Sequence, residues 1–280
     1  MKKLISIILS LCLLIAFSSS AFAAKPANEN TTTSNIETSV TNEYEAMLLL
    51  QQCSPSELSK KGYSESDINT INNADELFDE HIQRLAIMPE SRLTAAGYSN
   101  SQITSIKSYN PETATSSDKA RIAAECKTTS VIDRYTGKTG RVTSNFKWIG
   151  IPAFKMRDVL VTAWNNWQIT GKTANIKYTH INGTQADIWR SPTYQPPSSG
   201  MTSYGSGYRY PAALQDNAYY ASEGYSIFVL SRQSSSHLET ISRVIHQQGV
   251  IDITYTISSG FDIGISVGRT VLGDGHDETP

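Results

Sequence analysis

Hydrophobic and polar positions alternate most clearly between residues 141 and 167. Val142, Phe146 and Trp148 recur at a period of two among polar residues. That period predicts a strand with one buried face and one wet face. After a Gly-Ile-Pro break, residues 159–164 are nearly all apolar, which is typical of a strand covered on both sides. We interpret these two segments as central strands of a β-rich region.

Similar patterns predict further strands on both sides of this stretch. They cover residues 131–135, 174–180, 225–230, 238–246, 251–257 and 261–267. Asn182-Gly183 follows one of these strands and is a strong two-residue hairpin signal, which would place Ile176 opposite Trp189. Several antiparallel strands joined by hairpin turns predict a sandwich-like domain, with an open barrel as the alternative.

The N-terminal half instead contains a helical repeat. Residues 58–71 and 93–106 share the pattern Leu-x-x-x-Gly-Tyr-Ser-x-Ser-x-Ile-x-x-Ile, and every matched pair is 35 residues apart. Ser64 and Ser99 are suited to cap the second helix of each copy, and Gly62 to end the first in a left-handed conformation. We predict a small all-α domain built from this 35-residue repeat.

The first 23 residues have the composition of an export signal. Lys2 and Lys3 form a positive end, residues 4–17 are mostly apolar, and Ala21 and Ala23 supply small residues at the cleavage positions. No later stretch is long and apolar enough to predict a membrane-spanning helix. We therefore expect a chain that is secreted, or associated with the cell surface, and that keeps no stable membrane span after signal cleavage.

These patterns predict an α+β chain in two separately cored parts that meet near residue 126. In chain order we expect a signal peptide at 1–23, a disordered leader at 24–42, the helical repeat domain at 43–126, the β-sandwich domain at 127–271 and a flexible tail at 272–280.

Two cysteines remain outside the signal, Cys53 and Cys126. An exported chain with two cysteines favours one disulfide, which would tie the helical domain to the junction. The alternative is a pair of reduced thiols.

The numbers of basic and acidic side chains bear on whether the chain can bind nucleic acid. The chain has 24 basic and 26 acidic side chains. Neither half has the basic stripe that nucleic-acid binding requires, so we expect no nucleic-acid partner.

Half of the 14 tyrosines lie between residues 194 and 225, in a segment rich in Ser, Gly and Pro. This composition predicts a long loop, and long loops in compact domains are usually functional or disordered. Tyrosine offers rigid amphipathic rings that suit the apolar faces of sugars, so we predict that the loop binds a ligand. In the alternative, the loop packs its rings on its own domain. The candidate binding residues are Tyr194, Tyr204, Tyr208, Tyr210, Tyr219 and Tyr220.

Recognisable catalytic motifs are missing from the sequence. No serine lies in a G-x-S-x-G pattern, and there is neither an H-E-x-x-H motif nor a phosphate-binding glycine loop. We therefore predict no catalytic residue, metal or cofactor. The favoured function is non-catalytic binding of an extracellular component, either cell-wall polysaccharide or surface protein. A secreted hydrolase with a carboxylate-based site is the alternative, and a membrane-active or pore-forming protein is the third.

Overall fold

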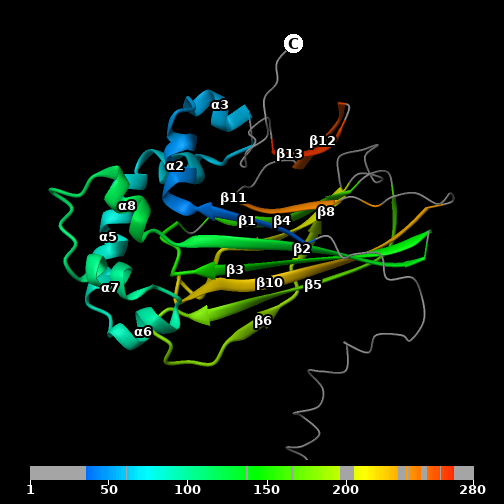
Figure 1. The fold of residues 1–280 in the computed structure, drawn as a ribbon. Coiled ribbons are helices and arrows are strands. Elements are labelled where there is room, and N and C mark those ends of the chain that lie inside the picture. The colour runs from blue at the N-terminus through cyan, green and yellow to red at the C-terminus, as the bar shows by residue number, and fades with distance from the viewer. Residues whose placement is uncertain are drawn as a thin grey trace, which may run out of the picture. The chain divides into compact units, whose positions relative to one another are not determined.

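Helices and antiparallel sheets make up the described part of the chain, so the predicted mixed α+β class is confirmed (Figure 1). The structure is a computed structural model. It describes residues 36–60, 62–136, 138–154, 156–164, 167–195, 205–232, 238, 240–246, 251–258 and 260–267. The predicted signal peptide, the tail and Tyr204 lie outside the described residues.

The helices gather at one end of the sheets in Figure 1. They are α2 (Glu43–Gln51), α3 (Pro55–Lys60), α4 (Glu65–Asn72), α5 (Ala74–Ala86), α6 (Glu90–Ala95), α7 (Asn100–Lys107) and α8 (Ser116–Ile122). The repeat corresponds to α3–α4 and α6–α7. The expected capping boxes are present at Ser64 and Ser99, and Gly62 and Gly97 have φ values of 88° and 98°. Local capping chemistry therefore sets the boundaries of these helices.

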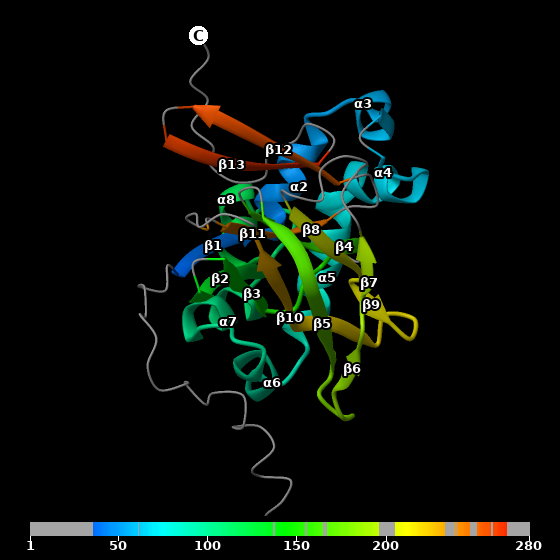
Figure 2. The same cartoon turned by 90° about the vertical axis from the view of Figure 1, so that its right-hand side faces the viewer.

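The strands form two larger antiparallel sheets and a separate hairpin, seen from the side in Figure 2. The seven-stranded sheet has the order β1 (Ile36–Asn42), β2 (Glu125–Thr136), β3 (Thr139–Ile149), β10 (Tyr219–Ser231), β5 (Gln168–His180) and β6 (Ile188–Arg190), with β9 (Ala213–Leu214) also paired to β10. The four-stranded sheet has the order β11 (Thr240–His246), β4 (Arg157–Trp164), β8 (Gly205–Pro211) and β7 (Thr193–Gln195). The hairpin pairs β12 (Ile251–Ser258) with β13 (Gly260–Val267).

A row of buried hydroxyl groups joins the inner faces of the two larger sheets. Ser144 Oγ on β3 lies 2.6 Å from Ser242 Oγ on β11 and 3.0 Å from Thr162 Oγ1 on β4. Along β3, Phe146 on one side of this row belongs to the larger apolar cluster, and Val142 on the other side belongs to a smaller one. The hydroxyl row therefore separates two apolar clusters between the sheets.

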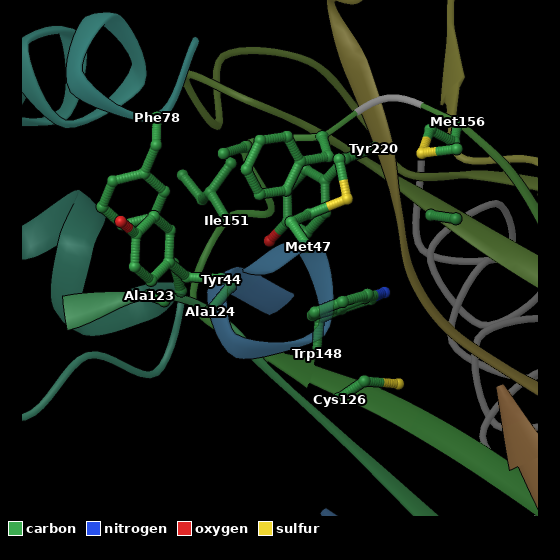
Figure 3. Close-up of a cluster of buried hydrophobic side chains, with 14 of the residues drawn as sticks. Tyr44, Met47, Phe78, Ala123, Ala124, Cys126, Trp148, Ile151, Met156 and Tyr220 are labelled. Carbon is green, nitrogen blue, oxygen red and sulfur yellow. The ribbon is translucent and has the colours of Figure 1, made fainter. Parts of the chain in front are cut away.

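The larger apolar cluster contains residues of both the helices and the sheets (Figure 3). Tyr44 and Met47 of α2 and Phe78 of α5 belong to the same cluster as Trp148 of β3 and Tyr220 of β10. The expectation of two separate cores is therefore wrong. Helices this short bury too little apolar surface on their own, and they complete their core against the end of the sheets.

Two sequence predictions near the junction are corrected. Residues 36–42, expected in the disordered leader, form β1, because their backbone pairs with β2. The helical domain, expected to reach residue 126, ends with α8 at Ile122, and Cys126 lies in β2 opposite Trp148. Strand pairing between segments so far apart in the chain leaves no local sequence signal, which explains both errors.

The structure shows no bridge between Cys53 and Cys126, and the disulfide stays a prediction. Strand β2 carries Cys126 into the shared core, where it is 3% exposed. Burial raises the pKa of the Cys126 thiol, and the nearby Asp158 raises it further. Cys126 is therefore a buried, protonated core residue.

Candidate functional site

The Tyr-rich segment does not form one long loop. Most of its described residues belong to β7, β8, β9 and the first half of β10, and residues 196–204 lie outside the described part. Tyr194 is partly buried, while Tyr208, Tyr210, Tyr219 and Tyr220 are 5% exposed or less. These four rings therefore offer almost no surface to a large ligand.

The buried tyrosines have partners inside the molecule. The Tyr210 ring stacks on Phe146 with ring centroids 5.3 Å apart, and the Tyr208 ring lies 5.6 Å from that of Phe228. The Tyr219 hydroxyl donates to Gln185 Oε1 at 2.7 Å. Their positions match the alternative in which the rings pack on their own domain.

A shallow hollow lies instead on the outer face of the seven-stranded sheet. It has a volume of about 360 Å³ and combines two aromatic side chains with polar and charged ones. We call it the sheet-face groove. It is lined by Lys127, Thr129, Asn145, Lys147, Trp189, Glu223 and Tyr225, with Phe146 and Gly224 at its base.

Strand register aligns the groove residues in rows across the sheet. In the first row, Lys127 of β2 lies opposite Lys147 of β3, and Lys147 lies opposite Glu223 of β10. The row continues through Lys177 of β5 to Trp189 of β6. Adjacent strands are about 4.8 Å apart, so the row from Lys127 to Trp189 spans about 19 Å.

The second row centres on Tyr225 of β10. Its strand neighbours are Asn145 of β3 and Asn175 of β5, and Thr129 of β2 lies opposite Asn145. Side chains at directly opposite positions on one face are close enough to contact the same ligand. An aromatic ring is thus flanked by amide and hydroxyl groups that can donate and accept hydrogen bonds.

Trp189 was not among the predicted site residues, because the expected hairpin register was wrong. The structure pairs Ile176 with Arg190 and Lys177 with Trp189. A shift of one residue moves a side chain to the other face of a sheet. Trp189 therefore points outward and is 49% exposed. Matching the apolar Ile188 to Tyr178, its observed partner, would have indicated the correct register from the sequence.

A lysine holds the acidic groups at one side of the groove. Lys177 Nζ lies 3.0 Å from Asp187 and 3.2 Å from Glu223. Burial raises the pKa of Asp187, but hydrogen bonds from Lys177 and Thr179 outweigh it and leave that pKa below its ordinary value. The hydrogen bond to Asp187 raises the pKa of Lys177, with a further contribution from Glu223. Lys177 and Asp187 are therefore both charged near neutral pH.

A larger hollow, of about 640 Å³, lies between the α5–α6 corner and the loops after β5 and β9. Ile87 at its edge is 85% exposed. The half-buried Arg92 at this hollow is used structurally, since it donates to the carbonyl oxygens of Ile181 at 2.6 Å and His180 at 2.9 Å. The sheet-face groove combines polar groups with the half-exposed ring of Trp189.

The described residues were also searched for a metal site and for a membrane-spanning helix. Within them, no group of three or more His, Cys, Asp or Glu side chains is placed to hold a metal ion. No helix among them has the length and apolar character to cross a bilayer. Comparison of the chain with protein-family models, curated proteins and solved structures found no match.

Proposed function

We propose that the chain is an exported, non-catalytic protein whose sheet-face groove binds an extracellular polysaccharide. One observation carries the proposal: Trp189 and Tyr225 lie on the outer face of one sheet, in the same hollow as Asn145, Thr129 and Glu223. Aromatic rings pack against the apolar C–H faces of sugars, and the polar side chains can bond the hydroxyl groups. The proposed binding surface is thus the outer face of a sheet, to which the Tyr-rich segment contributes Tyr225.

Export is part of this proposal. The basic, apolar and small-residue pattern of residues 1–23 supports signal cleavage before Ala24, and secretion or surface association afterwards. N-terminal sequencing of the protein from culture medium tests this step. A mature chain that begins near Ala24 is expected, and retention of residues 1–23 would contradict it.

The finer architecture also belongs to the proposal. We infer a helical-repeat part that begins at residue 43 and ends with α8 at Ile122, and a β-sandwich-like part that includes β1 and resumes at β2. The repeated helix–glycine–helix pattern supports the first, and the hydroxyl contacts between two sheets support the second. The two parts share one core.

Hydrolysis by a carboxylate pair has less support than binding. Glycosidases of the common type need one carboxylic acid that stays protonated. Asp187 and Glu223 are ion-paired to the same lysine, and the pKa of Asp187 lies below its ordinary value, which favours its ionised form. The membrane-active alternative rests only on the strand pattern of β12 and β13.

The experiment is a pull-down of the mature chain on insoluble polysaccharides, including cellulose, chitin and purified cell wall. Trp189→Ala and Tyr225→Ala are each expected to weaken retention by about two- to tenfold, the range of aromatic contact energies. Leu49→Ala is the control, because Leu49 is 51% exposed and lies on α2 outside the groove. Circular dichroism melting verifies that each variant folds. Equal retention of all folded variants would refute the groove as the site.

A further inference from the structure

The sheet-face groove contains two lysines at directly opposite positions. Lys127 and Lys147 are register partners on β2 and β3, and both are exposed on the outer face. Like charges directly opposite each other destabilise a sheet. Such a pair is least costly when an anion lies between the two ammonium groups.

The remaining charges of the groove are compensated within the protein. Lys177 holds Asp187 and Glu223 by ion pairs. Lys147 also has Glu223 as a register partner, but that carboxylate is ion-paired with Lys177. Neither Lys127 nor Lys147 makes an ion pair with another described residue. Lys127, Lys147 and Lys177 together carry one more charge than Asp187 and Glu223, so the groove has a net positive charge on the side where Lys127 and Lys147 lie.

Bulk charge does not account for attraction of a polyanion. The chain has a net charge of −2, so its overall field repels anionic polymers. Any preference for an anionic ligand must come from local contacts at short range, where salt screening is still incomplete.

We propose that the ligand of the sheet-face groove is an anionic polysaccharide. Its carboxylate or phosphate groups bind between Lys127 and Lys147, while its sugar rings pack on Tyr225 and Trp189. The proposal rests on the proposed function and specifies the ligand class of the same site. The first row fits it, because the positive pair lies at one end of the row and the Trp189 ring at the other.

The test compares binding of the mature chain to polygalacturonic acid and to its fully methyl-esterified form, a matched polymer without the charge. Wild type is expected to prefer the acid. Lys127→Gln and Lys147→Gln should each weaken binding of the acid about two- to fivefold, as for exposed ion pairs, and leave the ester unaffected. Lys60→Gln is the control, because Lys60 is exposed on α3, outside the groove. A poly(glycerol phosphate) arm distinguishes phosphate from carboxylate as the anion.

Each outcome separates this inference from the proposed function. Equal binding of acid and ester by wild type, or unchanged binding of the acid by the Lys127→Gln/Lys147→Gln double variant, refutes the anionic ligand. Loss of ester binding in Trp189→Ala then leaves the polysaccharide function standing. Wild type that binds none of the neutral or anionic polymers refutes both. Added salt should weaken acid binding by wild type much more than by the double variant.

Discussion

The buried carboxylate of Glu43 links the helices to the sheets at the start of α2. Its two oxygens accept hydrogen bonds from the backbone N–H groups of Ala124 at 3.2 Å and Ala153 at 2.8 Å. Its own backbone N–H donates to the Ala124 carbonyl at 3.1 Å. Glu43 is 1% exposed, so water cannot replace these contacts. One side chain thus holds the segment before β2 and the loop before β4.

Replacement of Glu43 by alanine would leave two buried N–H groups without an acceptor. Each unsatisfied N–H group costs about 1–3 kcal/mol. Removal of the buried carboxylate also removes its own desolvation cost, which offsets part of that loss. We expect a net loss of about 3 kcal/mol in the free energy of unfolding. For a domain of this size that corresponds to a fall in Tm of about 6–12 °C. Glu43→Gln should fall between wild type and alanine, because its amide oxygen accepts one N–H while its NH₂ group opposes the other.

Urea unfolding at pH 7, followed by tryptophan fluorescence, measures these differences. Glu45→Ala is the control, since Glu45 is exposed on the same helix and should change stability by less than about 0.5 kcal/mol. If Glu43→Ala and Glu45→Ala unfold at the same urea concentration with equal slopes, then Glu43 does not hold the two regions together.

Two further predictions concern packing and pH. Gly224→Ala should lower the free energy of unfolding by about 1–3 kcal/mol in the same urea assay, because the new methyl group would lie 2.6 Å from side-chain atoms of both Phe146 and Ile176. The hydrogen bond from Tyr44 lowers the pKa of Asp75, burial opposes this, and the 3.1 Å contact with Lys119 adds to the lowering. Asp75 therefore stabilises the fold above its unfolded pKa near 3.8, and this contribution is lost as the pH falls through the lower folded value. The Lys119→Met variant should be less stable than wild type at pH 7. It should also lose less of its remaining stability than wild type between about pH 4 and pH 2. An acid unfolding curve parallel to that of wild type would contradict this.

Features determined within one turn of the chain could be predicted from the sequence. The serine caps at Ser64 and Ser99 and the glycine ends at Gly62 and Gly97 depend only on neighbouring residues. The fully buried strand β4 was also predicted correctly, because an apolar run covered on both faces needs no partner to be recognised. The pairing of residues 36–42 with β2 depends on a distant strand, so a polar composition was mistaken for disorder.

The candidate site was missed for a related reason, and the hairpin after β5 shows why. Its Asn-Gly pair predicts a two-residue turn, whereas the observed pairing begins only at Tyr178 and Ile188. Because side chains alternate at a period of two, that one-residue difference decides whether Trp189 packs inside or faces solvent. The prediction for the tyrosines is wrong in the opposite sense, because Tyr208 and Tyr210 on β8 are expected to be accessible and are instead buried. Aromatic composition therefore does not identify the exposed rings, because the register of the sheet determines which of them face solvent.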